Sequence, residues 1–158
     1  MRKISMRIAF IVVTALLTNL TPALASIGFS CRTEDKSVMF TVEGAYGTSL
    51  GSGLINFGAD LQIKLAAAPD DIRKLKLDPS HVSQSWFRYR DLKLMARWQS
   101  GDGTPFREVL LMIETHRGKA EEAPYRGRYT LIVAASSSAS GGDTKRLEAS
   151  GAVACSVD

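Results

Sequence analysis

A serine between two glycines is the sharpest candidate for catalytic chemistry in the sequence. Residues 47–51, GTSLG, fit the G-x-S-x-G pattern, in which a nucleophilic serine sits on a strained turn between a strand and a helix. The residues that follow, 52–58, are too rich in glycine to begin a helix. The pattern therefore favours a flexible Gly/Ser loop over Gly44–Gly58, which we expect to be a contact loop. A serine hydrolase acting through Ser49 is the weaker alternative, and we assign no catalytic residue.

Two histidines, His81 and His116, are the remaining groups that could support catalysis or hold a metal. With Ser49 and an acid such as Asp60 or Asp91 they could complete a triad, but spacing along the chain does not fix geometry. A transition-metal site needs three or four His, Cys or carboxylate ligands. We therefore predict isolated surface histidines, no metal site and no cofactor.

Basic and aromatic residues gather in two segments of the second half of the chain. Tyr89 lies among those of the first segment. If strand parity holds, Lys93, Arg97, Arg126 and Arg128 point outward. Such a face could meet an acidic protein cleft, a phosphate-bearing envelope polymer or a sugar chain, although outward strand positions are often charged for solubility alone. The candidate partner-binding residues are Trp86, Arg88, Arg90, Lys93, Arg97, Arg126, Arg128 and, in the Gly/Ser loop, Ser49.

The first 25 residues have the organisation of a secretory signal peptide. A basic segment, Met1–Arg7, precedes ten apolar residues at 8–17, and Ala23-Leu24-Ala25 fits the small-x-small cleavage pattern. The apolar run is shorter than the roughly 20 residues of a membrane-spanning helix. We therefore expect cleavage before Ser26, a single β domain over residues 26–158, a periplasmic or secreted location, and no stable membrane insertion.

The charge of the expected mature chain gives no support for nucleic-acid binding. The whole chain carries a formal net charge of +4, but three of its twenty basic residues lie in the leader. Without Arg2, Lys3 and Arg7, 17 basic residues face 16 acidic ones. We therefore predict no nucleic-acid partner.

The two cysteines predict a disulfide between the chain ends. Two thiols in an exported protein are usually oxidised to a pair, and Cys31 and Cys155 both lie on apolar faces of predicted strands. Neither is part of a CxxC motif, which a redox-active thiol would favour. A closed loop of this length contributes roughly 4–5 kcal/mol in the chain-entropy model.

Alternation of apolar and polar residues, with a period of two, predicts antiparallel strands. At least seven such runs follow the leader, separated by turn residues such as Glu34–Lys36 and Ser100–Pro105. Proline and acids before bases at Pro69–Leu75 predict one short helix, while 78–89 could be a helical turn or a strand. The prediction is an all-β fold: a small antiparallel barrel or sandwich of about 7–8 strands, nearly closed, with its terminal strands joined by the disulfide.

These features lead us to expect an exported, non-enzymatic binding module. It would be an inhibitor of an envelope-attacking hydrolase or a binder of an envelope polymer, because small stapled β-scaffolds hold binding loops at little entropic cost. The alternative is a carrier of small apolar ligands with a cavity inside the barrel. Large inward residues such as Phe40, Trp98 and Tyr129 count mildly against that alternative.

Overall fold

The computed structural model describes residues 26–48, 53–102, 104–120, 123–137 and 143–158. Within them the chain forms nine antiparallel strands in one curled sheet with the order β4-β3-β2-β1-β9-β8-β7-β6-β5. The strand bounds are β1 Ser26–Glu34, β2 Val38–Gly47, β3 Leu54–Ile63, β4 Lys74–Leu77, β5 Val82–Arg88, β6 Asp91–Gln99, β7 Arg107–Arg117, β8 Tyr125–Ser136 and β9 Thr144–Val157.

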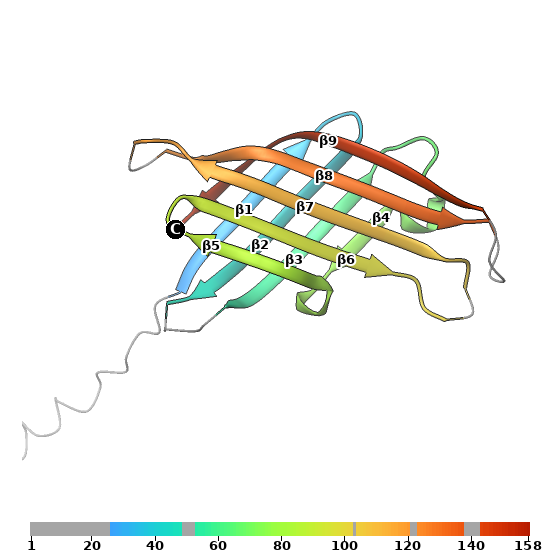
Figure 1. Cartoon of the computed structure of the whole chain (residues 1–158), viewed down its shortest axis with the longest axis horizontal. Coiled ribbons are helices and arrows are strands. Elements are labelled where there is room, and N and C mark those ends of the chain that lie inside the picture. The colour runs from blue at the N-terminus through green and yellow to red at the C-terminus, as the bar shows by residue number, and fades with distance from the viewer. Residues whose placement is uncertain (1–25, 49–52, 103, 121–122, 138–142) are drawn as a thin grey trace, which may run out of the picture.

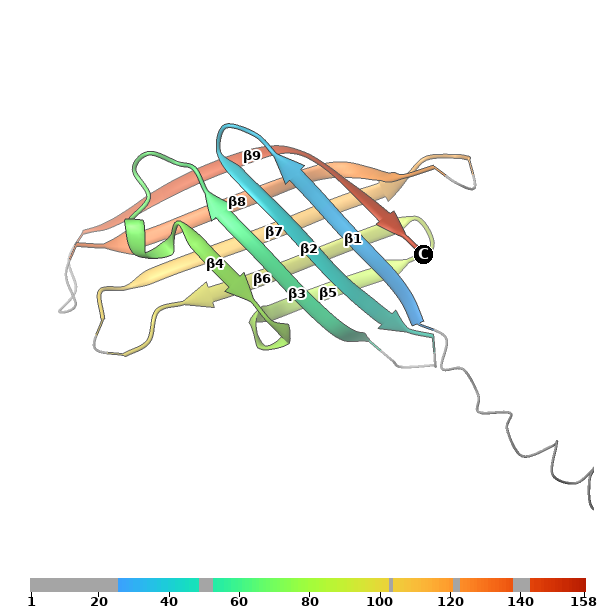
Figure 2. The same ribbon diagram turned by 180° about the vertical axis from the view of Figure 1, so that it is seen from behind.

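The sheet curls into a half-barrel of two facing layers. β1–β4 cross behind β5–β8 in Figure 1 and in front of them in Figure 2, with the long strand β9 passing along one side. β9 pairs with β8 along its length and with β1 near its end, so one strand carries the sheet from one layer to the other. Apolar residues at alternate strand positions fill the space between the layers.

The predicted disulfide is present. Cys31 and Cys155 are direct partners in the β1–β9 register, and their Cα atoms lie 4.0 Å apart. Both side chains are buried. The bond joins residues 124 positions apart in the sequence, at the junction of the two layers, and it confirms the prediction from the cysteine positions.

The strand count and the helix prediction need correction. The described residues contain nine strands rather than 7–8, and no α-helix. At Pro69–Leu75 there is a single 3-10 turn, η1 (Asp70–Ile72), closed by an Arg73 Nε–Asp70 Oδ1 ion pair of 2.7 Å. The strand β4 begins at Lys74, because Leu75 and Leu77 alternate with lysines and face the core.

The ambiguous segment 78–89 contains both a turn and a strand. It forms a second 3-10 turn, η2 (Pro79–His81), followed by β5. Asp78 caps this turn by accepting a hydrogen bond from the Ser80 amide, while His81 Nδ1 accepts one from the Asp78 amide. The sheet order ends at β4 and β5, so η2 joins its two edges.

The edge strand β5 pairs with β6 on one side, and aromatic rings hold it against the opposite layer. The Phe87 ring of β5 stacks on Tyr46 of β2 at a centroid distance of 5.3 Å, and Tyr46 contacts Phe29 of β1 at 5.5 Å. Phe87 also contacts Tyr125 of β8 at 6.2 Å. Aromatic pairs of this kind contribute about 0.5–1.5 kcal/mol each beyond area burial, so ring packing takes the place of strand pairing here.

The expected contact loop Gly44–Gly58 is shorter than predicted. β2 runs to Gly47 and β3 begins at Leu54, so both named ends of the loop lie inside strands. Gly44 is needed within β2 because a Cβ atom there would lie 2.6 Å from the Phe29 ring. Its lack of a side chain therefore reflects ring packing rather than loop flexibility.

Candidate functional site

The predicted basic and aromatic residues lie on the outer face of the β5–β9 layer. One register row contains Trp86, Lys93, Glu114 and Arg128, each on a successive strand from β5 to β8. Lys93 Nζ lies 3.5 Å from Glu114 Oε1. Trp86 is 54% exposed, a large area for an indole ring.

The next row toward the strand ends is also basic. It contains Arg88, Asp91, His116 and Arg126 across β5 to β8. His116 Nδ1 lies 3.0 Å from Asp91 Oδ1, which explains this histidine as one half of a surface pair. The exposure of Lys93, Arg97, Arg126 and Arg128 confirms their outward orientation.

The predicted cations differ in whether their charge is already engaged. Arg97 donates through two nitrogens to the Glu108 carboxylate, and Arg90 Nε donates to the carbonyl of Arg117 at 3.0 Å. By contrast, no salt bridge within the described residues involves Arg88, Arg126 or Arg128. These three arginines are therefore the ones whose charge is available to a partner.

The tip of the β5–β6 hairpin is the most unusual feature of this surface. Arg88 and Asp91 are the last backbone partners in the β5–β6 register, so Tyr89 and Arg90 alone make the turn. Tyr89 has a φ of 60° and is 90% exposed. Glycine or asparagine usually occupies such a position, and a bulky residue there is strained by about 1–3 kcal/mol.

Three hydrogen bonds hold this strained tip in place. The Arg117 amide donates to the Arg90 carbonyl at 2.7 Å, and Arg90 Nε returns a bond to the Arg117 carbonyl. The Tyr125 hydroxyl donates to the Tyr89 carbonyl at 3.3 Å. The exposed ring therefore sits on a backbone that is fixed by the start of β8 and the end of β7.

The strain at Tyr89 could not be predicted from the sequence. The residue lies among the predicted basic and aromatic group, but its conformation depends on the register of the hairpin. The available signal is the two-residue spacing between Arg88 and Asp91, which requires a turn without the usual Asn-Gly pair. That spacing becomes informative once 82–88 is known to be a strand.

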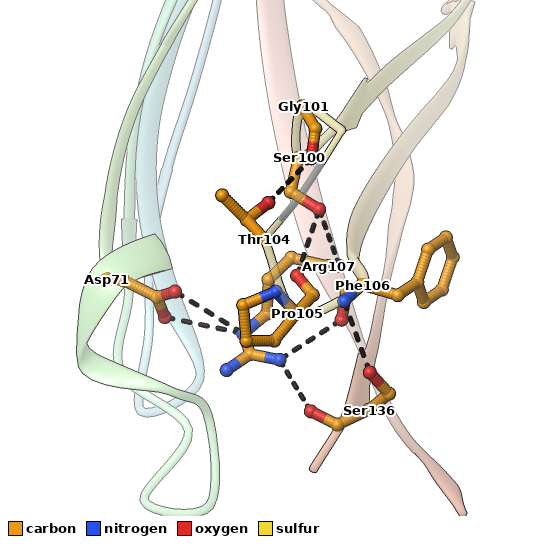
Figure 3. Close-up of polar contacts among 8 residues, drawn as sticks. All are labelled: Asp71, Ser100, Gly101, Thr104, Pro105, Phe106, Arg107 and Ser136. Atoms are coloured by element: carbon orange, nitrogen blue, oxygen red, sulfur yellow. Dashed lines mark hydrogen bonds and ion pairs between the residues drawn. The ribbon is translucent and has the colours of Figure 1, made fainter. Parts of the chain in front are cut away.

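Arg107, by contrast with the outward arginines, has a structural role. Arg107 at the start of β7 is largely buried, and its Nε lies 3.4 Å from Asp71 Oδ2 on η1 (Figure 3). Its Nη1 donates to the carbonyls of Phe106 and Ser136 at 3.1 and 2.6 Å. Arg107 thus joins η1 to β7 and β8.

The catalytic alternatives receive no support from the described residues. Ser49 lies outside them, and His81 is engaged in the η2 cap. No group of three His, Cys, Asp or Glu side chains in the described ranges could hold a metal ion. None of the described helices is long and apolar enough to cross a membrane.

The space between the layers is filled by side chains. Phe40 and Tyr129 meet edge-on at 5.5 Å in its middle, and both are almost completely buried with the leucines, isoleucines and valines around them. These side chains occupy the space that a carrier of apolar ligands would keep open.

Comparisons of the chain with protein-family models, with curated proteins and with solved structures give no match in any of the three.

Proposed function

We propose that this protein is an exported, non-enzymatic binding module that blocks the acidic cleft of a hydrolase attacking the cell envelope. The observation that carries the proposal is the β5–β6 hairpin tip. There the strained and exposed Tyr89 stands beside Arg88, whose charge is not paired within the described residues. Strained backbone positions cluster at functional sites, and Trp, Tyr and Arg are the residue types enriched in binding hot spots.

The chemistry of a glycan-cleaving cleft is complementary to this tip. Glycoside hydrolases place two carboxyl groups about 5–9.5 Å apart around the scissile sugar linkage. A guanidinium can bind one carboxylate through two parallel hydrogen bonds, while an adjacent aromatic ring fills the space of a sugar ring. Arg88 and Tyr89 offer these two groups on neighbouring residues.

The scaffold around the tip favours tight binding. Hydrogen bonds from Arg117 and Tyr125 hold the turn before a partner arrives, so little conformational entropy is lost on association. Arg126 and Arg128 on the same outer face would steer an acidic partner toward the hairpin. A periplasmic or secreted location belongs to this proposal, and the disulfide fits such an oxidising compartment.

The test is inhibition of enzymes by the oxidised protein, purified after export. Lysozymes with two active-site carboxylates and a set of proteases are assayed with the wild type and with Arg88→Glu. We expect inhibition of at least one lysozyme. Arg88→Glu should weaken inhibition at least about 30-fold, because losing one partner of an interfacial charge pair costs about 2–5 kcal/mol.

The matched control is Lys145→Glu, which reverses the charge of an exposed cation at the start of β9. It should inhibit like the wild type. Absence of inhibition across the whole panel would contradict the proposal. Equal weakening by the two variants would also contradict it, because the effect would then come from net charge alone.

A further inference from the structure

A shallow groove lies on the outer face where β9 separates from β1. The β1–β9 pairing ends at Arg32 and Ala154, whereas β9 stays paired with β8 back to its first residue. Figure 2 shows β9 continuing beside β8 beyond the end of β1. The groove measures about 310 Å³ and is lined by Arg32, Arg126, Gly127, Ala152, Val153 and Ala154.

Arginines flank this groove from two strands. Arg32 of β1 and Arg126 of β8 are both register partners of Ala154 on β9, so their backbones lie about 10 Å apart, twice the spacing of neighbouring strands. In the next outward row, Arg128 is the partner of Ala152. All five side chains are exposed. Three guanidinium groups therefore lie beside a floor of two methyl groups.

The positive charge of these arginines is available to a ligand. Arg126 and Arg128 form no salt bridge among the described residues. Arg32 Nη2 lies 3.7 Å from Glu43 Oε1, but the two side chains are 72% and 64% exposed, so this pair is weak and can give way to a ligand. Asp91, the acid in the row of Arg126, lies two strands away on β6.

Two further acids near the arginines already have lysine partners. Glu34 Oε1 lies 2.9 Å from Lys64 Nζ. Glu114, the register partner of Arg128, lies 3.5 Å from Lys93 Nζ through its Oε1 atom. Neither carboxylate lines the groove, so neither cancels the charge at its floor.

The acids of β9 itself lie beyond the groove. Glu148 is four residues from Ala152, and Asp158 is four residues from Ala154. At about 3.3 Å per residue these separations are about 13 Å, longer than the screening length of about 8 Å at physiological ionic strength. The groove is therefore net positive, and an anion is the ligand that its charge favours.

The arrangement suits a phosphate monoester better than a carboxylate. A phosphate monoester carries a charge of about −1.5 to −2 at neutral pH and has three acceptor oxygens. Guanidinium groups on two sides can each bind it through paired hydrogen bonds. A carboxylate carries one charge and has two oxygens, which a single arginine satisfies. Two arginines with only an alanine between them therefore match the phosphate.

The groove also favours a soluble ligand over a lipid surface. The large apolar side chains that are exposed among the described residues all lie outside it; they are Met39, Ile55, Trp86, Tyr89 and Phe106. Binding at a lipid surface uses buried apolar area as well as charge. The alanine floor offers no side chain for insertion into a membrane.

We propose that this groove binds the phosphate monoester group of a soluble ligand, such as a phosphorylated sugar. Arg32 and Arg126 would donate to the phosphate from two sides, and Arg128 would add positive charge. The site does not rest on the hydrolase proposal. Arg32 has no part in the proposed inhibition, so Arg32→Gln should lose phosphate binding and still inhibit like the wild type.

The test is a titration of the oxidised protein with glucose 6-phosphate, followed by the backbone amide signals of Gly127 and Ala154. Glucose, glucuronate and vesicles of phosphatidylglycerol are the comparisons. We expect saturable shifts with glucose 6-phosphate at up to about 10 mM, a range that covers millimolar binding. Glucuronate should bind more weakly, and glucose should cause no shifts.

Three outcomes would overturn the proposal. Absence of shifts with glucose 6-phosphate, or equal shifts with glucose, would show that the groove does not recognise phosphate. Equal affinity for glucuronate would make it a site for any anion. Binding to the vesicles without binding of the soluble phosphate would assign the arginines to a lipid surface.

Variants locate the binding in the groove. Arg32→Gln and Arg126→Gln should each weaken it about 10-fold or more, because each removes charged hydrogen bonds. Arg126→Lys keeps the charge without the paired donors and should be intermediate. Ala154→Glu places a carboxylate between the arginines and should abolish binding without lowering the unfolding temperature, since position 154 is exposed.

The matched control is Lys145→Gln, which removes an exposed positive charge from the same strand outside the groove. It should leave the affinity for glucose 6-phosphate unchanged. Unchanged affinity in both arginine-to-glutamine variants would contradict the assignment of the site. A loss in Lys145→Gln as large as theirs would also contradict it, because net charge would then explain the binding.

Discussion

At the scale of single residues, a tyrosine in the core stabilises the turn between the first two strands. The Tyr129 side chain is fully buried, and its hydroxyl donates to Asp35 Oδ2 at 2.5 Å. Asp35 Oδ1 accepts from the amides of Ser37 and Val38 at 2.7 and 3.0 Å. One carboxylate therefore links the β1–β2 turn to β8 in the opposite layer.

This arrangement changes the ionisation of both groups. Burial acts to raise the pKa of Asp35, but the Tyr129 hydroxyl, the two turn amides and the Lys64 ammonium together hold the pKa below its ordinary value. Burial and the Asp35 carboxylate both raise the pKa of Tyr129. The ionised acid and the neutral phenol are thus the native forms.

Asp35 makes stability depend on pH. Folding lowers the pKa of Asp35 below the ordinary aspartate value of about 3.9, so its contribution to stability is fully present above that pH and is lost as the pH falls through the lower native value. Asp35→Asn should lower the unfolding temperature at neutral pH and flatten the decline below pH about 4. Urea unfolding at several pH values measures this. An unchanged pH profile in the variant would mean that another carboxylate is responsible.

At the scale of elements, the alternation of apolar and polar residues predicted most of the strands. A strand with one buried face shows this alternation because its successive side chains point to opposite faces of the sheet. In β6 and β7, for example, buried residues recur at every second position over most of the strand. The charge order at Pro69–Leu75 suggested a helix, but Leu75 and Leu77 alternate with lysines and pack against the core, which suits a short edge strand over Lys74–Leu77. Local pattern could not decide, because the pairing of β4 with β3 is a long-range interaction.

The candidate surfaces were predictable to different degrees. Outward orientation of Arg126 and Arg128 followed from strand parity alone. The row that places Trp86, Lys93, Glu114 and Arg128 side by side was not predicted, because it depends on how β5, β6, β7 and β8 pair. The register between strands decides which residues become neighbours, and this register cannot be read from a single sequence.

Substitutions at Arg107 and Asp71 test which contacts stabilise this end of the half-barrel. Arg107→Ala removes the donors of two carbonyls and the Asp71 pair, and should lower the free energy of unfolding by about 1–3 kcal/mol. Asp71→Asn keeps the carbonyl contacts and should cost less than about 1 kcal/mol, because Asp71 is well exposed. Denaturant unfolding compares the two variants. Equal losses would assign the stabilisation to the ion pair instead.

At the scale of the whole molecule, the fold is a rigid support for exposed groups. The Cys31–Cys155 bond fixes the junction of the layers, and the rings of Phe29, Tyr46 and Phe87 fix the open edge. A constrained scaffold of this kind can hold Tyr89 in a conformation that an isolated hairpin would abandon. We propose that this strain serves binding rather than folding.

The most direct measurement is a paired one on Tyr89→Gly: the free energy of unfolding and the inhibition of the lysozyme bound most tightly by the wild type. Glycine adopts a φ of 60° without strain, so the unfolding free energy should stay equal or rise by up to about 1 kcal/mol. Inhibition should weaken at least about 30-fold, the effect of losing a hot-spot side chain worth about 2 kcal/mol or more. A variant that inhibits like the wild type but unfolds more easily would show that Tyr89 serves the fold, and would contradict the proposed role of Tyr89 in binding.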